Sequence, residues 1–287
     1  MPIHPLAVIS PAAKIAPDVQ IGPFCVVEAG VAIAEGCRLA ARVSVKADTV
    51  IGPNTEIGEG AVIGGMPQHL NRPAAPGGVL IGARNVIREN VTIHRAMERP
   101  HFTTIGNDCL LMVAAHVAHD CQIADNVILA NNVMLGGHVR VDHRAYLGGG
   151  VAVHQFCRVG RLAMIGGMAR IIQDVPPFVM IDGSSSLVVG MNRVGLKRAG
   201  FTPTEMQELK DAYRAVYRSG KLWCEILATL VQRFTSGVAA DFEPFLRTTT
   251  RGITSERRTP PRATVRLMRD DSDLDVEADA LDKRLVG

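Results

Sequence analysis

The sequence contains few aromatic residues. Phe, Trp and Tyr make up 4% of its 287 residues, although 47% of them are hydrophobic. Small and branched aliphatic side chains must therefore fill its core. The chain also lacks an apolar run long enough to span a membrane. Its first residues, MPIHPLAVIS, have no basic segment before the apolar ones, so they do not resemble a secretory signal peptide. We expect a cytoplasmic protein without integral membrane contact.

Strong charge and paired cysteines are absent as well. The formal net charge is +3, which is too small to indicate a nucleic-acid-binding protein. None of the six cysteines forms a C-x-x-C motif. This spacing excludes the common zinc knuckles and thioredoxin-like motifs.

What the sequence does contain is a repeat of six residues. Every sixth residue is Ile, Val or Leu, with two interruptions, in three series: Ile3 to Ile63, Ile81 to Ile93, and Ile105 to Ile171. The residue four positions later is small or branched, and Gly, Pro, Asp and Asn collect in between. A six-residue period is typical of a parallel β-helix, in which three hexads form one triangular coil.

This period predicts the position of most side chains. One aliphatic side chain per hexad points into a narrow prism, which explains the shortage of aromatic rings. Five cysteines occupy the small position next to it, so we expect them to be core residues: Cys25, Cys37, Cys109, Cys121 and Cys157. The two interruptions, at about 64–80 and 95–104, predict loops that project from the prism, and such loops often carry function.

The C-terminal third follows a different pattern. The hexads fade after Pro176-Pro177. We predict a β-helix domain at 1–190 and a helical domain at 191–253. Thr202-Pro203-Thr204-Glu205 has the form of a capping box with Pro at the first helical position. Two further helices are expected at 221–234 and 241–249. The charged segment 254–287 is expected to be disordered.

The histidines fall on the prism at related positions. Because a coil has three hexads of six residues, every eighteenth residue returns to the same edge. His119, His138 and His154 therefore lie within about one residue of one edge on consecutive coils, and His116 lies half a hexad before the first. A single histidine of this kind is usually an exposed polar residue, but a column of three favours a functional site.

A zinc site is the alternative for this column. The γ-class carbonic anhydrases bind zinc with three histidines between hexapeptide β-helices, and that site needs an H-x4-H pair. The stretch HVAHDC (116–121) offers only H-x2-H. We therefore predict no metal and no other cofactor.

Several motifs together resemble one family, the UDP-N-acetylglucosamine O-acyltransferases that begin lipid A biosynthesis. The resemblance runs from near the N-terminus to about Ile253. It rests on IRENVTIHR (87–95), AHVAHDC (115–121), LANN (129–132), GGHV (136–139), VHQF (153–156), QDVPPF (173–178) and GLKRAGF (195–201). The resemblance implies a left-handed parallel β-helix of hexapeptide repeats followed by a small α-helical domain.

The resemblance also implies an activity and its catalytic residues. The family transfers a 3-hydroxyacyl chain directly from acyl carrier protein to the 3-hydroxyl of the sugar. His119 matches the general base, Asp120 is the neighbour that orients it, and the Gly137 N–H matches the donor to the oxyanion. Residues that match substrate contacts are His69, His94, His116, His138, His154, Gln155, Gly167, Asn192 and Arg198.

The implied assembly is a homotrimer with sites between subunits. Its partners are acyl carrier protein and a UDP-sugar. In the helical region, positive charge for the acidic carrier protein is expected from Lys197, Arg198, Arg214, Arg218 and Lys221. An ordinary solvated helix face is about equally expected for Arg214 and Arg218.

The sequence departs from the family pattern where the acceptor sugar is recognised. His69 and Asn71 replace an acid and a lysine, Ser184–Ser186 replace Asn-His-Ala, and Val194 replaces Glu. A changed acceptor sugar, including a 3-amino analogue, is one interpretation. A non-catalytic trimer that binds nucleotide sugar or carrier protein is the alternative. The related N-acyltransferase of the pathway is a third option, but it carries an extra N-terminal domain, whereas the hexads here begin at Ile3.

Overall fold

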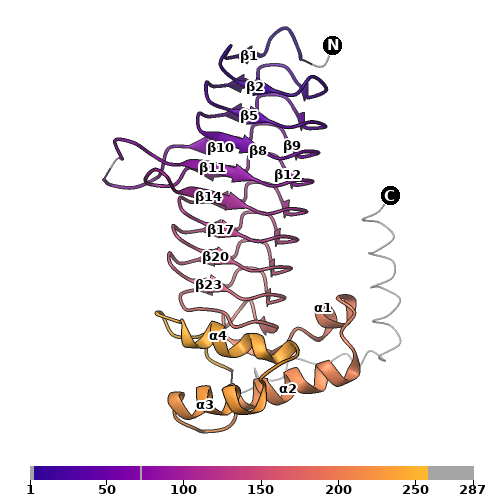
Figure 1. The fold of residues 1–287 in the computed structure, drawn as a ribbon, viewed down its shortest axis with the longest axis vertical. Coiled ribbons are helices and arrows are strands. Elements are labelled where there is room, and N and C mark those ends of the chain that lie inside the picture. Colours follow the sequence, from indigo (N-terminus) through magenta and orange to yellow (C-terminus); the bar gives the residue numbers. More distant parts are fainter. Residues whose placement is uncertain (1–2, 72, 258–287) are drawn as a thin grey trace. The chain divides into compact units, whose positions relative to one another are not determined.

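The computed structural model describes residues 3–71 and 73–257. All the elements below belong to one compact unit, residues 1–256. Most strands are only two residues long, and the second residue of each is the aliphatic residue of the hexad. Its side chain points inward, while the side chain before it points away from the prism. Three hexads make one coil, so the predicted parallel β-helix is confirmed (Figure 1).

The strands of the described residues form three sheets, which we name after their first strands. The β1 sheet contains β1 (Val8–Ile9), β4 (Val26–Val27), β7 (Ser44–Val45), β10 (Val62–Gly65), β13 (Thr92–His94), β16 (His116–Val117), β19 (Met134–Leu135), β22 (Ala152–Val153) and β25 (Arg170–Ile171). The β2 sheet contains β2 (Lys14–Ile15), β5 (Ala32–Ile33), β8 (Thr49–Ile51), β11 (Gly78–Ile81), β14 (Phe102–Ile105), β17 (Gln122–Ile123), β20 (Arg140–Val141) and β23 (Arg158–Val159).

The β3 sheet completes the prism. It contains β3 (Gln20–Ile21), β6 (Arg38–Leu39), β9 (Glu56–Ile57), β12 (Val86–Ile87), β15 (Leu110–Leu111), β18 (Ile128–Leu129), β21 (Tyr146–Leu147), β24 (Met164–Ile165), β26 (Val179–Ile181) and β27 (Val188–Met191). All these pairings are parallel except that of β26 with β27. The predicted domain boundary at residue 190 falls inside β27.

The interior of the prism is filled by aliphatic residues and cysteines. The inward residues from Ile21 to Ile171 are at most 3% exposed, and the five cysteines of the repeat are buried among them. The prediction that these cysteines are core residues is confirmed. A narrow, closely packed interior of this kind has no room for rings.

The corners of the prism are held by a second set of hydrogen bonds. At a corner, one residue adopts the left-handed conformation, and its N–H donates to a carbonyl on the preceding coil. His138 (φ 60°) donates to His119 O and Phe156 (φ 66°) donates to Gly137 O, both at 3.0 Å. These bonds fix a conformation that non-glycine residues rarely adopt.

Both predicted loops leave the prism at one corner, between the β1 sheet and the β2 sheet. The first joins β10 to β11 (66–77) and the second joins β13 to β14 (95–101); the projecting chain is visible beside β10, β11 and β14 in Figure 1. Each loop is shorter than predicted, because residues at both of its ends still pair with neighbouring coils. The coil that carries His119 follows directly after them.

The helical region contains α1 (Arg193–Arg198), α2 (Pro203–Tyr217), α3 (Trp223–Arg233), a 3-10 helix (Val238–Asp241) and α4 (Phe242–Arg247). The capping box predicted at Thr202 and Glu205 is present at the start of α2. Phe178 is fully buried and contacts the rings of Phe201 and Phe242, so it joins the end of the β-helix to the helices. Among the described residues, no helix is long and apolar enough to cross a membrane.

Asp174 ties the C-terminal segment to the last coils. Its buried carboxylate accepts hydrogen bonds from the Arg158 backbone N–H, the Arg158 Nε and the Thr249 hydroxyl at 2.8–2.9 Å. Its carbonyl accepts the Thr254 N–H at 2.8 Å. Ordered structure thus continues past residue 253, where the disordered tail was expected to begin, and Glu256 bridges to Val188. Residues 258–287 of that tail lie outside the described residues.

This junction generates a stability prediction. Asp174→Ala leaves the mostly buried Arg158 guanidinium without its carboxylate, and we expect the free energy of unfolding to fall by about 3 kcal/mol. Urea unfolding followed by circular dichroism at a fixed protein concentration measures it. Glu56→Ala, which removes an exposed ion pair with Arg38, is the control and should leave the urea midpoint nearly unchanged. Equal midpoints for the two variants would contradict this role of Asp174.

Candidate active site

His119 and Asp120 lie at the corner from which the loops project. The turn 118–121 joins β16 to β17, and Asp120 adopts the left-handed conformation (φ 59°). The Nδ1 of His119 is 2.8 Å from Asp120 Oδ2. A carboxylate only accepts hydrogen bonds, so Nδ1 carries the proton and Nε2 keeps a lone pair. The pair has the geometry of a histidine general base with an orienting carboxylate.

Gly137 faces this base from the next coil. A Cβ at this position would lie 2.7 Å from Cε1 and Nε2 of His119, so only glycine fits beside the ring. Among the described residues, the Gly137 N–H donates to no protein acceptor. A donor therefore lies next to the nitrogen that can take a proton.

The histidine column differs in one detail from the prediction. The rings of His119 and His138 are in perpendicular contact, with centroids 5.2 Å apart. The next ring beyond His138 is Phe156, which stacks on it at 4.6 Å, and not His154. The strand register aligns His154 with Gly136, one residue before the position of His119, and its Nδ1 lies 3.1 Å from the Gln155 carbonyl oxygen. The column is also less exposed than expected, since His119 is only 8% exposed.

A groove runs over the β1 sheet beside the base; we call it the histidine groove. Its volume is about 790 Å³. Polar residues on its walls include His69, His116, His119, Gly137, His154, Gln155 and Arg170. The rest is apolar, with Met134, Leu135, Ala152, Val153, Ile171 and Ile172. Such a groove suits a ligand with a polar reactive end and an aliphatic chain.

His69 belongs to the first loop and closes the groove over the base. Its ring lies perpendicular to that of His119, with centroids 5.8 Å apart. Its Nδ1 lies 3.1 Å from the Asn71 N and 3.3 Å from the Asn71 carbonyl oxygen, so the Asn71 backbone holds the ring whichever ring nitrogen carries the proton. The sequence predicted the residue as a substrate contact but could not predict its position next to His119.

A second histidine pair lies one coil earlier. The rings of His94 and His116 are 5.1 Å apart, and His116 Nδ1 is 2.8 Å from the Thr92 hydroxyl. Burial, followed by repulsion from a neighbouring imidazole, lowers the pKa of both His94 and His116. Burial also lowers the pKa of His138, although the Asp120 charge acts in the opposite direction. These histidines are neutral at pH 7.

A metal remains a geometric option at this corner. Ligand atoms of His119, Asp120 and His138 lie within 4.8 Å of one another. Asp120 Oδ2, however, already accepts the His119 Nδ1–H and the Met97 backbone N–H, the latter at 3.1 Å. A metal bound at this oxygen would compete with both donors. The arrangement therefore favours a hydrogen-bonded base, and the absence of a metal stays a prediction.

Three other predicted site residues lie elsewhere. Asn192 caps α1, accepting the Gly195 N–H and donating to the Leu162 carbonyl. Arg198 lies at the exposed end of the same helix. Gly167 lies at another corner, between β24 and β25. Among the described residues, no contact joins these positions to His119 within one chain.

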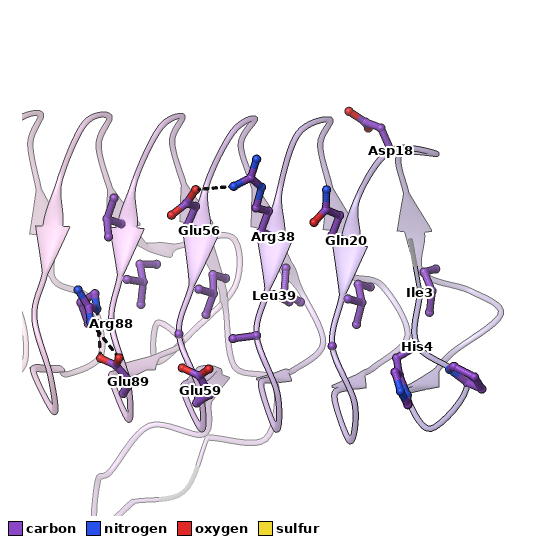
Figure 2. Close-up of a pocket in the computed structure, with 18 residues that line it drawn as sticks. Ile3, His4, Asp18, Gln20, Arg38, Leu39, Glu56, Glu59, Arg88 and Glu89 are labelled. Carbon is purple, nitrogen blue, oxygen red and sulfur yellow. Dashed lines mark hydrogen bonds and ion pairs between the residues drawn. The ribbon is translucent and has the colours of Figure 1, made fainter. Parts of the chain in front are cut away.

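A larger hollow on the β3 sheet lies apart from the histidines. It has a volume of about 920 Å³ and is lined by residues of β3, β6, β9 and β12. Figure 2 shows Arg38 paired with Glu56 and Arg88 paired with Glu89, at 3.4 Å and 2.9 Å. None of the predicted site residues lines it. Its charges are exposed and largely compensate one another, so we assign it no site.

The chain matches two family models. A model described as "Udp N-acetylglucosamine O-acyltransferase; Domain 2" matches residues 174–254. The model of the bacterial transferase hexapeptide repeat matches 30–65 and 102–137.

Similar proteins carry the same name. An acyl-[acyl-carrier-protein]–UDP-N-acetylglucosamine O-acyltransferase of Gloeothece citriformis is 50% identical over 160 residues, 56% of this chain and 58% of the relative. One from Synechocystis is 42% identical over 188 residues, 66% of this chain and 68% of the relative. The chain thus matches less than two thirds of the length of the Gloeothece relative.

Solved structures agree over most of the chain. The LpxA structure from Acinetobacter baumannii has a TM-score of 0.85 at 36% identity, covering 88% of this chain and all of that one. The UDP-N-acetylglucosamine acyltransferase from Francisella novicida has a TM-score of 0.86 at 38% identity, covering 89% and 95%. The predicted fold class, a left-handed β-helix with a small helical region, is confirmed.

Proposed function

The chain belongs to the UDP-N-acetylglucosamine O-acyltransferase family, and we propose that it transfers a 3-hydroxyacyl chain from acyl carrier protein to the 3-hydroxyl, or a 3-amino group, of a UDP-N-acetylglucosamine-type sugar. The observation that carries the proposal is the His119–Asp120 pair, which faces Gly137 in a groove with an apolar floor.

The proposed reaction is a direct acyl transfer. His119 Nε2 takes the proton of the acceptor hydroxyl while the oxygen attacks the thioester carbonyl. The Gly137 N–H donates to the resulting oxyanion. When the C–S bond breaks, the proton on His119 passes to the leaving thiolate, and the C–O bond of the ester remains. Asp120 holds Nδ1 and stabilises the imidazolium between these two steps.

An acyl-cysteine intermediate is not part of this proposal. Cys121 is next to Asp120 in the sequence, but its side chain points into the prism and is fully buried. Burial raises the pKa of Cys121 to about 12. A thiol with this pKa forms almost no thiolate at neutral pH and is a poor nucleophile.

The acceptor region supports recognition of a nucleotide sugar with altered contacts. His69 replaces an acid of the family pattern and lines the groove, where an imidazole can donate or accept a hydrogen bond while a carboxylate only accepts. Ser185 and Ser186 do not face the groove: Ser185 donates to Asp182, and Ser186 accepts the Arg170 N–H. Val194 is 60% exposed on α1.

We also propose a homotrimer, with Asn192 and Arg198 of one subunit completing the site of another. The outer face of the β3 sheet supports this assembly. Its outward side chains are polar at one end and apolar from β12 onward: Val86, Leu110, Ile128, Tyr146, Met164 and Met180. A monomer rarely exposes such a continuous apolar stripe.

Acyl carrier protein is the proposed donor partner. Fewer positive charges of this chain are free to bind it than the sequence suggested. Arg218 pairs with Glu256 at 2.7 Å, and Arg214 lies 3.9 Å from Asp211. Lys221 donates to the Thr229 hydroxyl. Lys197, Arg198 and Lys221 are exposed and have no carboxylate partner among the described residues, so they are the charges that an acidic partner can reach most directly.

The first prediction tests the base. His119→Ala should lower turnover by at least about 10²-fold, the usual loss when a general base is removed. Mass spectrometry of products from a panel of nucleotide sugars and acyl carrier proteins measures it. His143→Ala, an exposed histidine at another corner, is the control and should retain activity. Adding EDTA should not change the turnover of either variant. Near-normal turnover of His119→Ala would exclude His119 as the base.

The second tests the assembly. Ile128→Lys places an ammonium group in the middle of the apolar stripe, where burial between subunits would cost several kcal/mol. We expect the mass measured by light scattering to fall from trimer to monomer and activity to be lost with it. Gln20→Lys, at the polar end of the same sheet face, should leave the trimer intact. A trimeric Ile128→Lys protein would refute this interface.

The third concerns acyl length. Gly167 does not line the histidine groove of one chain, but it matches the family position that limits the acyl chain when it is bulky, so a glycine should admit a long chain. In Gly167→Met, the new Cβ lies 3.1 Å from Gly149 O, which requires only a small shift. Each methylene excluded from the groove forfeits about 0.8 kcal/mol, so a few of them should reverse the preference toward shorter donors. Competition between donors of different length measures it, and an unchanged preference would exclude Gly167 as the length determinant.

A further inference from the structure

The corner hydrogen bonds change their acceptor at Asp120. On the following coils, the left-handed residue donates its N–H to a backbone carbonyl, as His138 and Phe156 do. The preceding coil offers Asp120 no such carbonyl, because the loop 95–101 departs at this corner. The Asp120 N–H instead donates to the Thr103 hydroxyl at 2.8 Å. The acceptor of the Asp120 N–H is thus a side-chain hydroxyl and not a backbone carbonyl.

Thr103 occupies a buried position at which the two neighbouring coils place Val79 and Cys121. It is fully buried on β14, and the strand register aligns it with Val79 on the preceding coil. Cys121 holds the matching place on the following coil. A hydroxyl in such a place is destabilising unless it is hydrogen-bonded. Its contact with Asp120 provides that bond.

The loop also holds the other end of Asp120. The Met97 backbone N–H donates to Asp120 Oδ2, the same oxygen that accepts His119 Nδ1–H. Asp120 is therefore held at two points by the segment 97–103: Thr103 binds its backbone N–H, and Met97 binds its carboxylate. Its left-handed backbone (φ 59°) needs such support, because an aspartate gains little from this conformation by itself.

We propose that Thr103 is a positioning residue, whose hydroxyl holds Asp120 so that its carboxylate orients His119. The inference rests on the proposed acyltransfer. Among the described residues, the hydroxyl of Thr103 has one hydrogen bond, that from the Asp120 N–H, so its loss should affect the chemical step and not substrate binding. A misplaced carboxylate leaves the His119 ring free to rotate or to change its tautomer, and general-base catalysis weakens.

The test compares two substitutions of nearly equal size. Thr103→Val removes the acceptor and keeps the shape, and the same site accepts valine at Val79. We expect kcat to fall about 10- to 100-fold, as it does when a catalytic group is displaced by about 1 Å, with KM for both substrates unchanged. Thr103→Ser retains the hydroxyl and should keep kcat within about twofold of wild type, because its acceptor remains in place.

Thr49→Val is the matched control. Thr49 is also fully buried and pairs with Val79 from the opposite side. In the part of the chain that the structure describes, its hydroxyl has no hydrogen-bond partner. The control should leave kcat unchanged. A Thr103→Val enzyme with wild-type kcat would overturn the proposal, and so would a Thr103→Ser enzyme that loses as much activity as Thr103→Val.

Hydrogen exchange gives a second measurement that does not depend on the valine variant. The Asp120 amide of the wild type should exchange as slowly as those of His138 and Phe156, and fast exchange would refute the bond to Thr103. The proposed function and the role of Thr103 can fail separately. A folded wild-type protein that is inactive with every nucleotide sugar contradicts the proposed function. An active wild type with an equally active Thr103→Val variant contradicts only the role of Thr103.

Discussion

The fold depends on the spacing between successive coils. Each coil lies one strand separation, about 4.8 Å, from the next, and along the strands and at most left-handed corner residues of the described chain a backbone N–H donates to a neighbouring coil. This spacing forces one side chain per hexad into the prism, directly beside those of the coils around it. The interior can then hold only aliphatic residues and thiols of similar size. The shortage of aromatic residues, the buried cysteines and the short strands all follow from this constraint.

The candidate site arises where the regular spacing is interrupted. Two loops leave at the same corner on successive coils, and the coil after them carries His119 and Asp120. The first loop brings His69 over the base, and the second brings Met97 to the carboxylate. The following coils supply Gly137 and the stacked ring of Phe156 without any interruption. A rigid scaffold thus provides the donor and the base, while the loops determine how closed the groove is.

The sequence predicted the features that depend on periodicity. A hexad fixes which residue points inward, so the strands, the core and the neighbouring positions of His119 and His138 follow from counting. It could not predict contacts made by segments outside the period. The position of His69, the bond from Thr103 to Asp120 and the pairing of Arg218 with Glu256 depend on how loops and the C-terminal segment return to the prism. His154 was expected within about one residue of this edge, and the register places it one residue before the position of His119, so it lines the groove but does not stack in the column.

The loop from 66 to 77 has a consequence for how such enzymes diversify. Its two ends are held by β10 and β11, and both strands pair with the coils on either side, with one register shift between Ile63 and Gly65 where the loop begins. Lengthening a loop costs little, about 0.6 kcal/mol for each doubling, because the closure entropy grows only with the logarithm of its length. Segments can therefore be exchanged at this corner without repacking the prism. A graft of one loop would therefore change the residues that line the groove around His69, while His119, Asp120 and the contact of Met97 with Asp120 stay in place.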